Sequence, residues 1–320
     1  MDQHSTALNQ IDINTVHFLP NESHFDEYIQ SLNPTVEALT ILDTQDIHSL
    51  RNGASIHQVK EFCPPVVSEI DGSANSEIIR ELSSIHRSDH TWVVSDYEQK
   101  MLDEVYAIER EKVSVCSFFY SEAEMNNNQT STEHGPIDEK LWPRIREKLN
   151  HQAELHVYGA YPDRGSLALT DKNLGVKVRG VIEDQYDMLQ RYRINFAPLR
   201  FGAGIKGKIS DGFFCGTPTI TTRIGGEGMT LDGSDNDGQW GGIISRRASD
   251  SGLEDELVEG AVRLYTDQTL WEEKREHGYN VIREMFSEEK NERVMMDTIN
   301  ELVANKKRIR EKNLTGALLW

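Results

Sequence analysis

Cysteine and long apolar runs are scarce in this chain. Its three cysteines, Cys63, Cys116 and Cys215, stand far apart in 320 residues, so neither a disulfide framework nor a zinc site is expected. No run of about 18 apolar residues occurs, as a transmembrane segment would need. The first ten residues show neither the basic start nor the apolar stretch of a secretory signal, and we therefore expect a cytoplasmic location.

Basic residues are also outnumbered. Lys and Arg total 34 against 53 Asp and Glu, which gives a formal net charge of −19. A surface of this sign repels phosphate backbones, so nucleic acid is not expected as a partner. Hydrophobic residues nevertheless make up 37% of the chain, which is enough for two folded cores.

Short apolar segments alternate with amphipathic ones in the first half. Runs of about five residues rich in Val, Ile and Thr are typical of buried strands, and they occur at Thr15–Leu19, Ala38–Leu42, His90–Val94 and Lys112–Cys116. Helices are expected between them at Ser23–Leu32, Asn75–Ser88 and Asp96–Ile108. The repeated order of strand, helix and strand predicts an α/β fold with a parallel sheet.

The same alternation resumes after a polar stretch over residues 122–136, which we interpret as a linker or surface loop. A helix is expected at Ile137–Leu149, followed by strands at Glu154–Tyr158, Val176–Arg179, Ile194–Pro198, Thr217–Thr221 and Gly242–Ser245. From Leu253 onward the pattern is almost entirely helical. We predict two Rossmann-like domains, residues 1–125 and 126–287, with C-terminal helices over 288–320 bridging them.

A glycine-rich turn between a strand and a helix is the most informative segment. In INFAPLRFGAGIKGKISDGFF, which begins at Ile194, the glycines are Gly202, Gly204 and Gly207, and a helix is expected from Lys206 or Gly207. Such a turn lets backbone amides approach an anion at the helix N-terminus. The local charge is also reversed to +3, from Arg200, Lys206, Lys208 and Arg223 against Asp211. The pattern favours a phosphate site.

The glycine spacing alone leaves alternatives open. It satisfies the dinucleotide pattern GxGxxG, with Glu227 as a ribose ligand, and so permits a nicotinamide-dependent oxidoreductase. It fails the P-loop pattern, because Ile209 stands where a magnesium-binding hydroxyl is required. A turn that only packs a helix on the sheet is the structural alternative.

Several longer segments together resemble a known family. Three segments are similar to the donor-binding segment of retaining nucleotide-sugar glycosyltransferases of the GT-B fold, in the family-four group. They are APLRFGAGIKGKI, DGFFCGTPTITT and IGGEGM. Two earlier segments resemble preceding parts of that domain: LHVYGAY and VKVRGVIEDQYDMLQRY. Three segments of the first half resemble the acceptor domain of one subgroup: ILDTQDIHSLR, SDHTWVVSDYEQK and VSVCSFFY. The resemblance covers about Leu39 to Met229 and implies two Rossmann-like domains of GT-B type.

The resemblance also implies roles for particular residues. Lys206 would hold the donor diphosphate and, with Glu227 and the acceptor-side His48, form the catalytic set. The alternatives are that Glu227 only occupies a turn and that His48 is a polar surface residue. Many members carry two carboxylates eight positions apart, and the second binds the ribose; the matching positions here are Ala203 and Asp211. A first-turn helix acid is the alternative for Asp211. The donor-binding set is Gly202, Gly204, Gly207, Lys206, Asp211, Arg200, Gly180 and Val181.

The activity that the resemblance implies is a retaining transfer of a sugar from a nucleoside-diphosphate donor to a glycan, lipid or protein acceptor. No metal-ligand cluster is visible and no further cofactor is implied. The chain departs from the family where the Gly-rich openings of both domains should stand. These segments are missing or shortened, which leaves three alternatives open: a divergent enzyme with reduced activity, an incomplete gene model, or an inactive nucleotide-sugar-binding or scaffold remnant.

Overall fold

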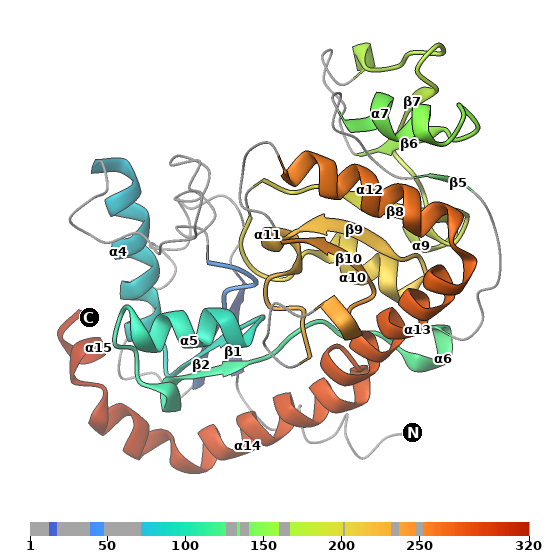
Figure 1. Cartoon of the computed structure of the whole chain (residues 1–320). Helices are drawn as coiled ribbons and strands as arrows, with labels where there is room; N and C mark the ends of the chain where they lie inside the picture. Colours follow the sequence, from blue (N-terminus) through green and yellow to red (C-terminus); the bar gives the residue numbers. More distant parts are fainter. Residues whose placement is uncertain are drawn as a thin grey trace. The chain divides into compact units, whose positions relative to one another are not determined.

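The computed structural model describes residues 13–17, 39–47, 72–125, 133–134, 141–159, 167–200, 202–231, 237–246 and 252–319. These residues form two compact units (Figure 1). The second unit runs continuously from Phe118 to Glu289, apart from the gaps in the described ranges. The first unit contains the described residues up to Ser117 together with those from Lys290 onward.

The first unit is built on a parallel sheet with the strand order β1-β2-β3-β4. Its strands are β1 (Ile13–His17), β2 (Leu39–Asp43), β3 (His90–Val93) and β4 (Val113–Val115). Its helices are α4 (Gly72–Arg87), α5 (Asp96–Glu104), the 3-10 helix η1 (Arg110–Lys112), α14 (Glu288–Lys312) and α15 (Leu314–Leu319). The four predicted strands are confirmed, β1 two residues earlier than expected; the helix expected at Ser23–Leu32 lies outside the described residues.

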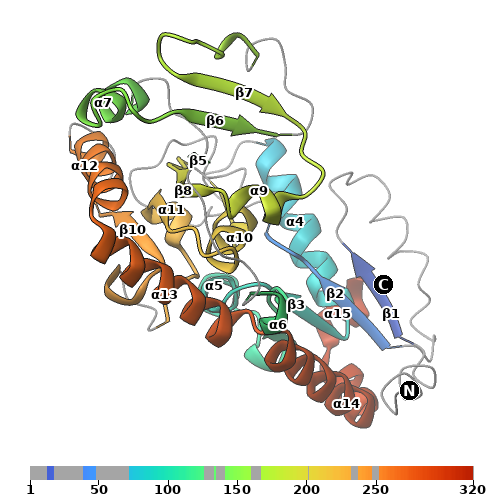
Figure 2. The same ribbon diagram turned by 90° about the vertical axis from the view of Figure 1, so that its right-hand side faces the viewer.

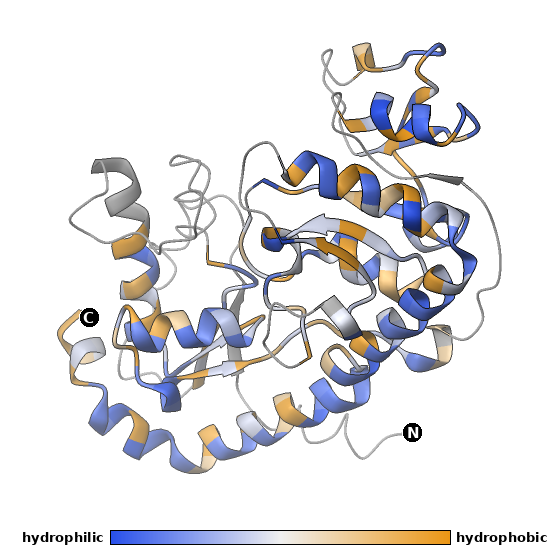
Figure 3. Cartoon of the chain, viewed as in Figure 1, coloured by the Kyte–Doolittle hydropathy of each residue, from blue (hydrophilic) through white to orange (hydrophobic). Residues whose placement is uncertain are grey.

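Helix α14 supplies part of the core of the first unit. Ile299 and Leu302 are three positions apart and therefore lie on one face of the helix. Both are buried in one apolar cluster with Leu39, Ile41 and Trp92 of the sheet. The rest of α14 is mostly hydrophilic, with apolar positions at intervals (Figure 3). The C-terminal segment is thus an integral part of this unit.

Helix α5 begins at the N-cap residue Ser95, and the nearby carboxylate of Glu98 also holds the loop after β2. The Ser95 hydroxyl accepts from the Glu98 backbone N–H, and Glu98 is fully buried. One carboxylate oxygen of Glu98 accepts from the Ile47 N–H at 3.2 Å, and the other accepts from the Val94 N–H at 3.3 Å. A buried carboxylate therefore holds the backbone N–H of Ile47, the residue directly before His48 in the sequence.

We expect Glu98→Gln to lower the free energy of unfolding of the first unit by about 1–3 kcal/mol, because an amide NH₂ would replace an acceptor that faces backbone donors. Glu104→Gln is the matched control, since Glu104 lies at the exposed end of the same helix and should change stability by less than about 0.5 kcal/mol. Thermal unfolding followed by circular dichroism measures both. Equal midpoints for the two variants would contradict the assigned role.

The second unit contains a parallel sheet of order β10-β9-β8-β5. It also contains a parallel pair, β6 and β7, which is visible in Figure 2. Its strands are β5 (Glu133–His134), β6 (Leu155–Tyr158), β7 (Val176–Gly180), β8 (Tyr192–Ala197), β9 (Thr219–Thr222) and β10 (Gly242–Ser245). Its helices are α6 (Glu122–Met125), α7 (Leu141–Lys148), α9 (Gln185–Leu189), α10 (Gly207–Phe214), α11 (Arg223–Gly226), the 3-10 helix η2 (Asp237–Gln239), α12 (Leu253–Thr266) and α13 (Gln268–Met285). All five strands predicted here are confirmed.

Strand β5 corrects the interpretation of residues 122–136 as only a linker or loop. Glu133 and His134 pair in parallel with Tyr192 and Ile194 of β8, with a register shift between them. Two polar residues show no alternation, and the local pattern therefore contains no strand signal. The described part of the opening strand of this domain is two residues long, and residues 126–132 and 135–140 on either side of it lie outside the described ranges.

Strand β5 also lies beside β6, although the two form no ladder. The spatial order is then β7-β6-β5-β8-β9-β10, the order of a doubly wound Rossmann domain. In such sheets ligands bind outside the carboxyl ends of the strands, where the strand order reverses. Here the reversal lies between β5 and β8. The loop that leaves the carboxyl end of β8 is the glycine-rich segment identified in the sequence.

The core of the second unit sits between this sheet and α12. Ile194, Phe196 and Ile220 of the strands are buried against Val258 and Leu264 of the helix. Trp142 and Ile145 of α7 join the same cluster. These contacts anchor β8 and β9 in the core, so the loop after β8 begins at a packed strand.

Candidate active site

The glycine-rich loop takes a path that only glycine adopts readily. Gly202 has φ of 153° and Gly204 has φ of 62°, both in the region that side chains disfavour. An added Cβ at Gly202 would meet only the Cε of Lys206, at 3.5 Å. The backbone conformation, rather than lack of space, therefore explains the glycine there. This path brings the chain from β8 back to the start of α10.

Lys206 lies at the N-terminus of α10, as expected. It is the N-cap residue, and no side chain caps the helix by a hydrogen bond. Its side chain is only 5% exposed, and its Nζ donates to the Gly204 carbonyl at 2.7 Å. A buried ammonium therefore lies beside the partial positive charge of a helix end. Together these groups favour an anion at this point.

Asn195, which the sequence pattern did not single out, fixes α10 on the sheet. Its buried side-chain amide donates to the Lys208 carbonyl at 2.8 Å and to Thr219 Oγ1 at 3.1 Å. Gly212 allows the close approach, because an added Cβ would lie 2.9 Å from the same amide nitrogen. A polar residue in a strand between apolar neighbours is the signal that could have revealed it.

Glu227 lies directly after α11 and meets Lys206, so the structure brings two predicted catalytic residues together. The Nζ of Lys206 is 3.9 Å from Oε2 of Glu227, whose side chain is 19% exposed. Burial raises the pKa of Glu227, and the positive charges of Lys206 and Arg223 partly offset this rise. The pair places one acid beside the buried cation.

Asp211 lies beyond the first turn of α10, which contains no acidic residue. The alternative of a first-turn helix acid is therefore wrong. One Asp211 oxygen accepts from the Tyr120 hydroxyl at 2.7 Å and the other accepts from Gln185 Nε2 at 3.3 Å. Burial raises the pKa of Asp211, while the hydrogen bond from Tyr120 lowers it. Neither Tyr120 nor Gln185 was predicted.

The remaining predicted residues lie at the end of a strand, in a loop, at the start of a helix or outside the described ranges. Gly180 ends β7 with φ of 77°, and Val181 after it is 70% exposed. Arg200 is exposed in the loop after β8. Gly207 is the first residue of α10, and an added Cβ there would meet nothing within 4 Å. His48 lies outside the described residues.

Among the described residues, no three acidic, histidine or cysteine side chains lie together in a way that could hold a metal ion. No described helix is long and apolar enough to cross a membrane.

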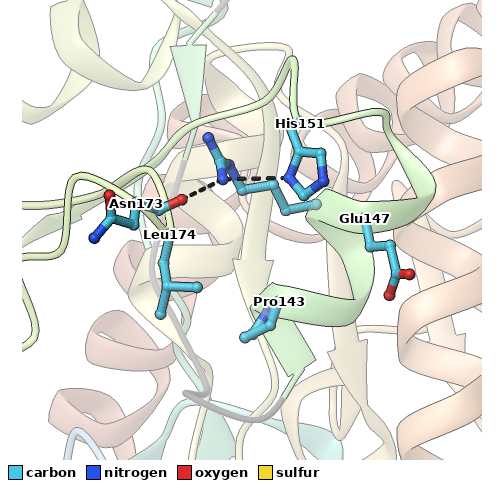
Figure 4. Close-up of a pocket in the computed structure, with 6 residues that line it drawn as sticks. Pro143, Glu147, His151, Asn173 and Leu174 are labelled. Atoms are coloured by element: carbon cyan, nitrogen blue, oxygen red, sulfur yellow. Dashed lines mark hydrogen bonds between the residues drawn. The ribbon is translucent and has the colours of Figure 1, made fainter.

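A separate cavity of about 280 Å³ lies in the second unit, lined by Pro143, Arg146, Glu147, His151, Asn173 and Leu174 (Figure 4). The Arg146 guanidinium donates to the Asn173 carbonyl at 2.5 Å and to the Ala153 carbonyl at 3.3 Å. These bonds tie the turn before β7 to the end of α7. None of the lining residues was predicted to bind the donor, and Arg146 has a structural role here.

Comparison with known proteins supports the family resemblance. Residues 139–267 match the family model described as glycosyl transferases group 1. This match covers the region from α7 to α12, including Lys206, Asp211 and Glu227. It favours sugar transfer over the nicotinamide-dependent alternative. No curated protein sequence matches the chain.

Solved structures of glycosyltransferases share the fold. S. aureus TarM, in a complex that contains UDP, matches with a TM-score of 0.57 and 13% identity over 82% of this chain and 51% of its own. The pneumococcal O-GlcNAc transferase GtfA, in complex with UDP and GlcNAc, has a TM-score of 0.59 and 13% identity over 93% and 59%. Sucrose-phosphate synthase from Thermosynechococcus elongatus has a TM-score of 0.62 and 15% identity over 94% and 76%.

These likenesses establish the fold. It is the predicted two-domain, Rossmann-like GT-B fold. The chain spans about half the length of the TarM chain.

Proposed function

We propose that the chain is a retaining glycosyltransferase that moves a sugar from a nucleoside-diphosphate donor to an acceptor without a metal ion. The observation that carries this proposal is the buried Lys206 ammonium at the uncapped N-terminus of α10. Breaking a sugar-phosphate bond leaves negative charge on the diphosphate, and a fixed cation stabilises that charge as it develops. The family match over the same residues supports this role.

Glu227 is the second group of the proposed site. Its carboxylate lies 3.9 Å from Lys206 Nζ, and it would keep the ammonium charged and oriented before the donor binds. In the donor complex the diphosphate would pair with the Lys206 ammonium, and the Glu227 carboxylate could then contact the sugar. The neighbouring complexes with UDP support a nucleoside diphosphate as the donor class.

A catalytically inactive nucleotide-sugar-binding remnant is the second candidate. Ala203, which is buried, occupies the position where many family members carry the first of two carboxylates. A protein without that acid keeps the cation and the helix end that hold phosphate. It would then bind donor without transferring sugar.

Calorimetry and thermal shift with UDP-, GDP- and ADP-sugars, with NAD as the comparison, test the proposal. One nucleotide sugar at about 100 times its Kd should stabilise the protein by about 2.7 kcal/mol, and NAD should not. Release of labelled sugar from that donor then separates the enzyme from the inactive remnant. Stabilisation by NAD alone would overturn the proposal.

We expect turnover to survive EDTA, because Lys206 and the end of α10 supply the positive charge that a metal would otherwise bring. The initial rate should be the same before and after exhaustive chelation, within error. A rate lost on chelation and restored by Mn²⁺ would show that the reaction needs a metal. Parallel calorimetry with UDP in EDTA shows whether binding is affected separately.

A further inference from the structure

Tyr120 is held firmly in the second unit. Its backbone N–H donates to the Phe286 carbonyl at 2.9 Å, and its carbonyl accepts from the Glu288 N–H at 3.1 Å. Its ring centroid lies 4.9 Å from that of Phe214 and 6.4 Å from that of Phe286. The residue is only 7% exposed. Together, the backbone hydrogen bonds and ring contacts fix the position of the Tyr120 hydroxyl.

That hydroxyl meets α10 at two side chains. It lies 2.7 Å from Asp211 Oδ1 and 2.9 Å from Ser210 Oγ. An ionised carboxylate can only accept, so the phenolic hydrogen points to Asp211. Ser210 Oγ donates in turn to the Gly207 carbonyl at 3.0 Å or to the phenolic oxygen. The Tyr120 hydroxyl therefore donates its hydrogen bond to Asp211.

Gln185 holds the other oxygen of Asp211, at 3.3 Å, from the first residue of α9. Each carboxylate oxygen can accept about two hydrogen bonds, so acceptor capacity remains on both. Two such acceptors side by side suit two neighbouring hydroxyl groups, as on the ribose of a nucleotide.

The electrostatics favour the same arrangement. Burial raises the pKa of Asp211, and the hydrogen bond from Tyr120 acts against this rise. Burial and the nearby Asp211 both raise the pKa of Tyr120. The phenol therefore keeps its proton near neutral pH and remains a donor.

We propose that Tyr120, helped by Gln185, is a positioning residue that keeps Asp211 ionised and aimed at the ribose hydroxyls of the donor nucleotide. The inference rests on the proposed function, since it needs a nucleotide at this site. Tyr120 itself does not touch the reacting atoms. It acts through Asp211.

The test compares Tyr120→Phe with Tyr279→Phe, a matched control in the same unit. The Tyr279 hydroxyl accepts from Arg275 and is not part of the Asp211 contacts described above. Calorimetry uses whichever of UDP, GDP and ADP binds the wild type most tightly, together with its 2′,3′-dideoxy counterpart. Tyr120→Phe should weaken binding of the ribonucleotide by about tenfold, as for a lost hydrogen bond to a charged group. Its affinity for the dideoxynucleotide should not change.

A pH series adds a readout that simple loss of packing would not move. Affinity for the ribonucleotide requires ionised Asp211, so it should fall as the pH drops through the pKa of that group. Without the Tyr120 hydroxyl that pKa is higher, and the fall should begin at a higher pH. Tyr279→Phe should follow the wild-type curve.

Two further variants complete the design. Asp211→Asn should abolish the preference for ribonucleotide over dideoxynucleotide, and adding Tyr120→Phe to it should have no further effect on that preference. Gln185→Met, at an exposed position, should reduce the preference less than Tyr120→Phe, because its hydrogen bond is longer. If Tyr120→Phe does not fold, Gln185→Met alone tests whether these hydrogen bonds to Asp211 support the ribose preference.

The outcomes separate the two proposals. If the wild type binds none of the three nucleoside diphosphates, the proposed function fails and this inference falls with it. If the wild type binds one of them, but Tyr120→Phe weakens both nucleotides equally or Asp211→Asn keeps the ribose preference, only the positioning role is overturned.

Discussion

Lys206→Ala should weaken nucleotide-sugar binding by about 1.5–3 kcal/mol, the range for loss of a charge-assisted hydrogen bond. Turnover should fall further, by about 10²–10³ in kcat, if Lys206 also stabilises the charge that develops on the leaving diphosphate. The physical reason is that its ammonium is almost fully enclosed and lies at an uncapped helix end. Calorimetry on protein shown to be folded gives the first value, and initial rates give the second.

Loss of Lys206 also changes Glu227. Burial raises the pKa of that acid, and Lys206 is the first of the two charges that oppose the rise. In the variant the pKa of Glu227 should be higher still, so any step that needs its carboxylate should fail at a higher pH than in the wild type.

The control is Lys172→Ala, which removes an exposed lysine of the second unit and should leave binding and turnover unchanged. Unaltered affinity in Lys206→Ala would show that the phosphate is held elsewhere.

Arg310→Ala should destabilise the first unit by about 2–4 kcal/mol, because breaking a buried ion pair leaves an uncompensated charge. Arg310 Nε and Nη2 donate to the two oxygens of Asp89, each at 2.7 Å. The Asp89 side chain is 6% exposed and that of Arg310 is 32% exposed, so the effect should stay below that of a fully enclosed pair. Asp89 also accepts from the Thr40 N–H at 2.9 Å, which links the pair to β2.

Hydrogen exchange of the β2 and β3 amides measures this effect within the first unit. Lys307→Ala is the matched control on the same helix. Its side chain is 91% exposed and lies 3.9 Å from Glu311, so its removal should change the stability of the first unit by at most about 0.5 kcal/mol. Arg310→Lys should reduce hydrogen-exchange protection by an amount between those of Arg310→Ala and Lys307→Ala, because lysine keeps the charge but not the bidentate geometry. Equal protection in Arg310→Ala and Lys307→Ala would refute the argument.

The strands were predictable where apolar residues fill them. The β2 segment LTIL is buried along its length, and the sequence pattern predicted it to within one residue. Strand β5 was not predictable, because its two residues are polar and its pairing with β8 depends on residues about 60 positions later in the chain. Local pattern carries no information about such pairing.

The candidate site shows the same division. The family resemblance assigned Lys206 and Glu227 separately to the donor site, but their contact at 3.9 Å was not predicted. The hydrogen bond from Tyr120 to Asp211 joins residues 91 positions apart, and no periodicity or spacing near either residue indicates it. Asn195 could have been noticed, since a buried amide between apolar strand residues needs partners.

The insertion of the second unit within the first has a consequence for biosynthesis. A ribosome makes the strands of the first unit early, yet the core of that unit needs Ile299 and Leu302 of α14. The first unit therefore cannot complete its core until α14 has been translated, while Phe118–Glu289 can collapse earlier as one contiguous stretch. Domains usually finish folding in the order of synthesis; here we expect the reverse order. A nascent chain halted before Lys290 should hold a protease-resistant second unit and a protease-sensitive first one.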